Sequence, residues 1–146
     1  MRERTWEIDG EAGAKLHARS WAPDAAPHSL AVIAHGLAEH CGRYGELVGH
    51  LVGAGYAVYA LDHRGHGRSS GGRANIDRFD HVLADLDRLF AQARADWPGR
   101  PATLIGHSMG GAIAFAYAVR HQDALHALVL SAPLLVVTAD SAAADR

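Results

Sequence analysis

Four short apolar runs alternate with helical patterns along this chain, and this alternation most constrains its fold. The runs span residues 29–34, 56–61, 102–105 and 127–132. Nearly every residue in them is apolar, which is typical of strands buried on both faces of a parallel sheet. The segments between them are long enough for the crossovers that a parallel sheet requires. We therefore predict an α/β fold with a mostly parallel sheet and flanking helices.

The segments between these runs have the period of amphipathic helices. Apolar side chains recur three or four residues apart over 44–52 and 79–97, and a third helix is expected over 108–120. Near the start of the chain, residues 5–8 and 15–21 flank a group of turn residues, which predicts an antiparallel hairpin that opens the sheet. A length of 146 residues is typical of one domain.

Composition argues against several classes of protein. The net charge of −2 gives no electrostatic basis for a nucleic-acid partner. Cys41 is the only cysteine, so an internal disulfide cannot form, which favours a reducing compartment. The N-terminal segment is polar, unlike a secretory signal, and the most apolar run, 127–137, is too short to span a bilayer. We expect a cytoplasmic protein without stable membrane insertion.

Residues 106–110 form the pattern G-x-S-x-G, which is typical of a nucleophile elbow. An apolar strand precedes the pattern and a helix follows it, as the motif requires. Gly106 and Gly110 are small where strand and helix crowd together, and the strained turn would expose the hydroxyl of Ser108. The amide of Met109, at the helix start, would donate to a developing oxyanion. The alternative is a tight glycine turn with an inert serine.

An oxyanion hole needs a second donor, from the loop after an earlier strand. Gly36 permits a tight exit from the strand at 29–34, and the amide of Leu37 is the candidate donor. An ordinary strand-to-helix loop is the alternative at this position.

The loop after the strand at 56–61 has two further interpretations. Gly65, Gly67 and Gly71 loosely match a dinucleotide-binding loop, but no helix opens there. His63 and His66 suggest a metal-binding pair, with Asp62 beside them, but no second cluster has metal-ligand spacing. We interpret the three as part of a polar surface loop and predict neither a metal nor a cofactor.

Four stretches together resemble one protein family. They are HGLAEHCGRY (35–44), LDHRGHGRSSG (61–71), GHSMGG (106–111) and LVLSAP (128–133). In this order they resemble the monoacylglycerol lipase and lysophospholipase branch of the α/β-hydrolase superfamily, which is similar to the serine aminopeptidase S33-type hydrolases. The resemblance runs from about residue 5 to residue 135.

The resemblance implies a cofactor-free hydrolase of carboxylic esters, with monoacylglycerols or related lipid esters as the small acyl substrates. Ser108 would be the nucleophile, and the amides of Leu37 and Met109 would form the oxyanion hole. Structural roles are implied for three further motif residues, His35, His40 and Tyr44. Residues 1–146 would be the N-terminal part of a single α/β-hydrolase domain, truncated before the lid and the last strands.

The family order is serine, then acid, then histidine. Of the histidines after the serine, His121 ends the helix roughly 18 Å away, and His126 begins a strand at the opposite end of the sheet. His107 would point to the other face of its strand, and His35, the nearest base, has a structural motif role. Asp140 has no histidine to orient. The activating groups are therefore expected outside this chain.

Two interpretations remain open at this point. The chain is either the N-terminal half of a serine ester hydrolase or a shortened, non-catalytic relative that binds an acyl ligand or a partner protein. In both, the apolar strand at 126–137 would be an exposed edge, open to self-association or to pairing with a C-terminal half.

Overall fold

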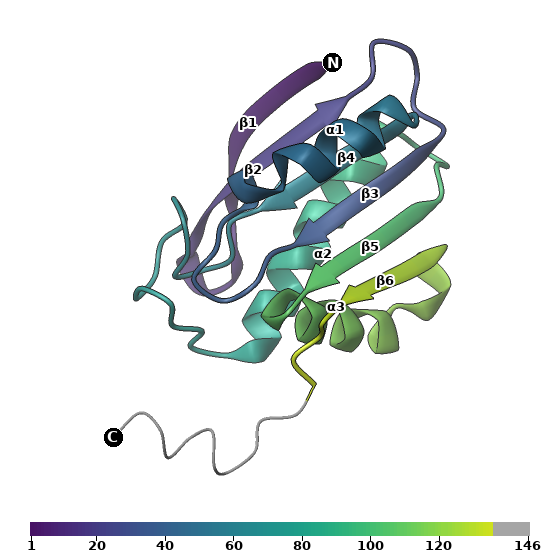
Figure 1. Cartoon of the computed structure of the whole chain (residues 1–146). Helices are drawn as coiled ribbons and strands as arrows, with labels where there is room; N and C mark the ends of the chain where they lie inside the picture. The colour runs from purple at the N-terminus through teal and green to yellow at the C-terminus, as the bar shows by residue number, and fades with distance from the viewer. Residues whose placement is uncertain (136–146) are drawn as a thin grey trace.

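The computed structural model describes residues 1–135, which form one six-stranded sheet between two layers of helices (Figure 1). The sheet has the order β1-β2-β4-β3-β5-β6. Strands β3 to β6 run parallel, whereas β1 and β2 form an antiparallel hairpin whose second strand pairs with β4. The strands are β1 (Arg2–Asp9), β2 (Lys15–Ala22), β3 (Ser29–Ala34), β4 (Tyr56–Leu61), β5 (Ala102–His107) and β6 (Ala127–Ser131).

The α-helices are α1 (Gly45–Gly53), α2 (Phe79–Asp96) and α3 (Met109–Arg120), with 3-10 turns η1 (Glu11–Gly13), η2 (Cys41–Tyr44) and η3 (Gln122–Ala124). All the predicted strands and helices are present, and the predicted fold class is confirmed. The bounds differ by a few residues. Strand β5 continues to His107, because its last two residues still pair with β6. The segment expected to open as a helix at Tyr44 opens instead with the 3-10 turn η2.

Helices cover both faces of the sheet, so the apolar strands are buried on both sides. Helix α1 lies on one face, where Val48 and Val52 pack against side chains such as Ile33 and Val58. Helices α2 and α3 cover the other face, where the larger core cluster lies (Figure 1). This arrangement explains why the runs at β3 and β4 are apolar at nearly every position rather than at alternate ones.

The loop after β4 differs from the prediction. Asp62, His63 and His66 were expected in a polar surface loop, but all three are buried. The Arg64 guanidinium reaches back under this loop and donates to both carboxylate oxygens of Asp85 on α2, at 2.8 and 3.0 Å. A charged pair that is bidentate can compensate for its own burial. The Arg64–Asp85 pair fixes the loop against α2, and this position buries Asp62, His63 and His66.

No helix within residues 1–135 combines the length and the apolar character that crossing a membrane requires.

The two edges of the sheet differ in chemistry. Strand β1 carries charged side chains along its length, at Arg2, Glu3, Arg4, Glu7 and Asp9, which discourages pairing with another chain. Strand β6 instead exposes Leu128 and Val129, the latter 48% exposed. Of the segment 126–137 predicted as an apolar edge, residues 136–137 lie outside the described residues. Asp140 lies outside them too.

We expect the 146-residue chain to self-associate through β6, because an exposed apolar strand offers unpaired backbone groups to a second chain. Light scattering at micromolar concentration measures the assembly. Val129→Lys should shift the chain toward monomer, whereas Val119→Lys, at an equally exposed position on α3, should not. A monomer that neither substitution alters would contradict this expectation.

Candidate active site

Ser108 occupies a strained turn between β5 and α3. Its backbone has φ 54° and ψ −118°, a conformation that non-glycine residues rarely adopt and that costs about 1–3 kcal/mol. The residue precedes the first residue of α3, and it is partly exposed. Strain of this kind persists only where surrounding contacts stabilise it, so the contacts of Ser108 indicate whether the strained turn is a functional feature.

Backbone hydrogen bonds hold the turn from both sides. The N–H of Ser108 donates to the carbonyl of Ser131 at the end of β6, at 3.0 Å. Its carbonyl accepts from Gly111 inside α3 and from Leu134 beyond β6, both at 2.9 Å. Backbone groups of β6 and of the segment after it therefore hold Ser108 on one side, and the first turn of α3 holds it on the other.

Two glycines allow the close approach of strand and helix, as the sequence predicts. A Cβ atom on Gly110 would lie 2.0 Å from the carbonyl oxygen of Ala34 and 2.5 Å from that of His35. A Cβ on Gly106 would lie 2.3 Å from the carbonyl oxygen of Gly110. Because these obstacles are backbone atoms, no rotamer change relieves them. The first turn of α3 thus rests directly on the end of β3.

The loop after β3 approaches the serine closely. A Cβ on Gly36 would lie 3.4 Å from the Cβ of Ser108, so the loop and the elbow are in near contact. Within residues 1–135, neither the N–H of Leu37 nor that of Met109 makes a hydrogen bond to the protein. Met109 opens α3, where first-turn N–H groups have no acceptor inside the helix. The two predicted donors therefore lack a protein acceptor among the described residues, and each lies on an element that adjoins Ser108.

Glu39 holds this loop in shape. Its carboxylate accepts from the N–H of Gly36 at 2.8 Å and from the hydroxyl of Tyr44 at 2.9 Å. Burial alone would raise the pKa of Glu39, but these two hydrogen bonds outweigh it, and the net pKa is lowered. The ionised carboxylate thus occupies the Gly36 amide, whereas the next amide, that of Leu37, makes no hydrogen bond within residues 1–135. Sequence reasoning missed Glu39, although it stands three residues after Gly36 in the motif.

Three histidines form a buried cluster behind the loop. The rings of His35 and His63 lie 4.3 Å apart, and those of His35 and His66 lie 5.3 Å apart. The Nε2 atom of His35 accepts from the backbone N–H of His63 at 2.9 Å, so its proton is on Nδ1, which donates to the carbonyl of Gly36. Burial lowers the pKa of His35 to about 4 and that of His63 well below its usual range. His35 and His63 are therefore neutral at pH 7.

No histidine of residues 1–135 hydrogen-bonds the Ser108 hydroxyl. Both ring nitrogens of His35 are engaged by backbone groups, and the Nδ1 of His107 is directed to Ser131. His121 stacks on Tyr117 at the far end of α3, and the N–H of His126 pairs with Ala102 at the start of β5. Among the described residues, the Ser108 hydroxyl therefore has no hydrogen-bonded histidine that could act as its general base.

This sheet and elbow define an α/β-hydrolase, and solved structures agree. A carboxyl esterase from Bacillus coagulans matches with a TM-score of 0.82 and 28% identity over 89% of this chain. A monoglyceride lipase from Saccharomyces cerevisiae matches with a TM-score of 0.83 and 25% identity over 99% of it. Residues 25–145 match the model of the family serine aminopeptidase S33, and the chain belongs to that family.

Curated relatives point to the branch that the sequence motifs resemble. The monoacylglycerol lipase of Mycolicibacterium smegmatis is 44% identical over 124 residues, which are 85% of this chain and 44% of that enzyme. Human monoglyceride lipase is 39% identical over 130 residues, or 89% of this chain and 43% of the enzyme. The chain therefore spans less than half the length of these relatives.

The glycine contact can be tested by stability. Gly110→Ala should lower the free energy of unfolding by about 3 kcal/mol or more, because the new methyl group meets fixed carbonyl oxygens. Gly49→Ala, on α1, is a matched control, because no heavy atom lies within 4 Å of a Cβ added there. It should stabilise the chain by about 0.5–1 kcal/mol through helix propensity. Urea denaturation measures both, and equal effects would contradict the close approach.

The burial of His35 and His63 predicts that stability falls on acidification at pH values above those at which most carboxylates titrate. Unfolding restores His35 from a pKa of about 4 to its ordinary 6.5, so the unfolded chain binds protons first as the pH falls. Stability is then full above pH 6.5 and declines below it. His35 alone should remove about 2 kcal/mol between pH 7 and pH 5. Denaturation at pH 7, 6 and 5 measures this, and a flat profile would show that these rings are solvated.

Proposed function

We propose that this chain supplies the nucleophile and the oxyanion hole of a serine ester hydrolase. The single observation that carries the proposal is the strained backbone of Ser108, because a binding surface has no need of a serine held at this cost. The two uncommitted amides beside it support the proposal, since a tetrahedral oxyanion requires donors at that position.

The reaction would proceed through an acyl-enzyme. The Oγ of Ser108 attacks the ester carbonyl carbon, and the oxyanion that forms accepts hydrogen bonds from Leu37 and Met109. The alcohol leaves with a proton, and water then hydrolyses the acyl-serine. The base that takes the Ser108 proton, and the acid that orients the base, would come from residues outside 1–135. We propose that a C-terminal half provides them, so that residues 1–146 are part of one hydrolase domain.

The surroundings of the elbow favour a lipid ester. Leu37 is 55% exposed on the loop beside Ser108, and exposed Leu134 donates its backbone N–H to the Ser108 carbonyl. These apolar side chains suit an acyl chain better than a charged substrate. The relatives named monoacylglycerol lipase and lysophospholipase support monoacylglycerols or lysophospholipid-like esters as the substrate class. We propose a cytoplasmic location, which the buried, unpaired Cys41 supports.

Complementation tests this function. The 146-residue chain alone should hydrolyse short p-nitrophenyl esters poorly, because loss of a triad member costs up to about 10⁶ in turnover. Adding the part of the Mycolicibacterium smegmatis relative that this chain does not cover should restore activity. Ser108→Ala should then reduce turnover by about 10⁴ or more, and Ser29→Ala, at the opposite end of the sheet, should leave it unchanged.

Two outcomes would count against the proposal. Full turnover by the chain alone that Ser108→Ala abolishes would show that the base is already present. A soluble complex of the two parts without activity would favour the non-catalytic alternative, in which the chain binds an acyl ligand or a partner.

A further inference from the structure

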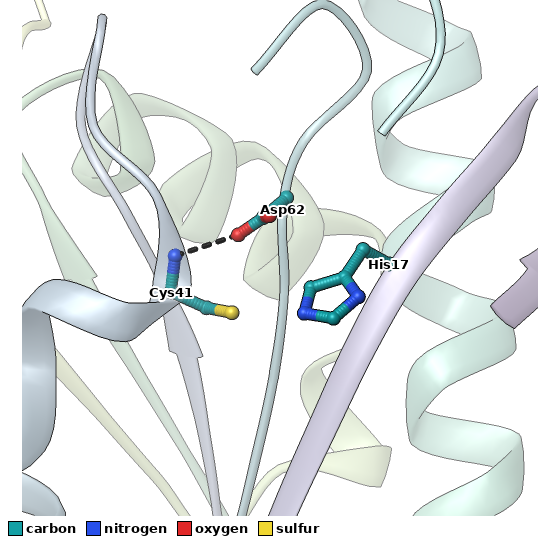
Figure 2. A group of neighbouring side chains, drawn as sticks. All are labelled: His17, Cys41 and Asp62. Atoms are coloured by element: carbon teal, nitrogen blue, oxygen red, sulfur yellow. Dashed lines mark hydrogen bonds between the residues drawn. The ribbon is translucent and has the colours of Figure 1, made fainter. Parts of the chain in front are cut away.

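A second group of reactive side chains lies away from Ser108, near the hairpin. His17 on β2, Cys41 at the start of η2 and Asp62 after β4 each offer one ligand atom, and these three atoms lie within 4.8 Å of one another. Figure 2 shows the sulfur of Cys41 pointing toward the ring of His17, with the carboxylate of Asp62 beside them. The three residues come from separate elements, so no spacing in the sequence reveals them.

The carboxylate of Asp62 is already fixed in place. One oxygen accepts from the N–H of Cys41 at 2.8 Å, and the other accepts from the N–H of Arg68 at 2.9 Å. A Cβ on Gly67 would lie 2.2 Å from that second oxygen, so the loop can wrap the carboxylate only with glycine there. Each oxygen retains a lone pair after these bonds, which leaves the carboxylate able to bind a cation.

The backbone also ties His17 to Asp62. The N–H of Asp62 donates to the carbonyl of His17 at 2.8 Å. The hydroxyl of Ser69 accepts from the N–H of His17 and donates to the carbonyl of Asp62, at 2.9 and 2.5 Å. Together with the bond from Cys41 to Asp62, these contacts hold all three candidate ligands on one rigid frame. Such supporting hydrogen bonds are what orient the ligands of metal sites.

We infer that His17, Cys41 and Asp62 form a binding site for a divalent transition metal, with Zn²⁺ as the best match. Imidazole, thiolate and carboxylate are the donors that zinc takes in proteins, whereas calcium and magnesium prefer oxygen alone. Ligand atoms on one zinc ion lie about 3.3–3.8 Å apart. The present separations therefore need a contraction on the order of 1 Å.

The charges of the site balance on binding. Burial, the first cause, and a hydrogen bond to Asp62 raise the pKa of the Cys41 thiol, so the thiol is protonated before metal arrives. Zinc forms a bond to the sulfur as the S–H bond breaks, and the proton leaves to solvent. Burial lowers the pKa of His17, which keeps its imidazole neutral and available. One thiolate and one carboxylate then neutralise the two charges of the ion.

An open side of the site faces a cavity of about 600 Å³, whose lining also includes Glu3, Arg19, His40 and Arg68, the last of which adds a positive charge that disfavours a cation. A zinc ion with three protein ligands keeps a fourth position for water, which this cavity can hold. Arg19 would repel a cation, but it is paired with Glu3 and lies over the ring of Trp21. A bound ion would join the hairpin to η2 and to the loop after β4.

Metal binding can be measured without any reference to Ser108. The full 146-residue chain should bind one Zn²⁺ in equilibrium dialysis. With Co²⁺ as the probe it should show a thiolate-to-metal charge-transfer band in the near ultraviolet, which reports Cys41 directly. Ser108→Ala should bind equally well, which separates this inference from the proposed hydrolase activity.

Matched variants decide the assignment. Cys41→Ser keeps a side chain of similar size and replaces the thiol with a hydroxyl that can also donate to Asp62, so the fold should persist by circular dichroism. Cys41→Ser and His17→Gln should each weaken Zn²⁺ binding by at least about tenfold, and Cys41→Ser should remove the Co²⁺ band. His50→Gln, at an exposed histidine of α1, should change neither. Absence of the band in the wild-type chain, or Zn²⁺ binding that Cys41→Ser leaves unchanged, would overturn the assignment.

Discussion

The contact between the first turn of α3 and the end of β3 is the constraint on which this structure depends. Gly110 lies so close to the carbonyls of Ala34 and His35 that no side chain fits between them. With the helix held there, the chain has one residue in which to turn from β5 into α3, and Ser108 absorbs the strain with φ 54°. The position of the Ser108 hydroxyl is therefore a consequence of packing in the core.

The same contact organises the rest of the site. Because α3 begins directly at the end of β3, the Met109 amide and the loop after β3 both lie next to Ser108. Glu39 then fixes that loop by occupying the Gly36 amide, which leaves the Leu37 amide uncommitted. The end of β6 and the segment after it also hold Ser108, through the backbone groups of Ser131 and Leu134. Under the proposed function, the Leu37 and Met109 amides would form an oxyanion site that is already in place when the substrate binds.

Local sequence was sufficient for the elements and the elbow, because both depend on short-range signals. Apolar runs and helical periods predicted the sheet, and G-x-S-x-G predicted the turn at Ser108. Burial of polar side chains depended on long-range contacts instead. His63 and His66 are buried because Arg64 pairs with Asp85 on α2, and Asp85 stands three residues after Val82 within the apolar stripe of that helix. An acidic residue within an apolar stripe was the one signal in the sequence for a buried ion pair, and the sequence did not indicate that Arg64 is its partner.

Covalent labelling of the serine tests the central claim most directly, since the claim is that this chain holds Ser108 as a preformed nucleophile. The complemented protein would be treated with an alkyl fluorophosphonate, and the modified peptide identified by mass spectrometry. The account predicts one adduct per chain, on Ser108, formed much faster with the complementing part than without it. An adduct on another serine, or none in a complex that hydrolyses esters, would contradict it.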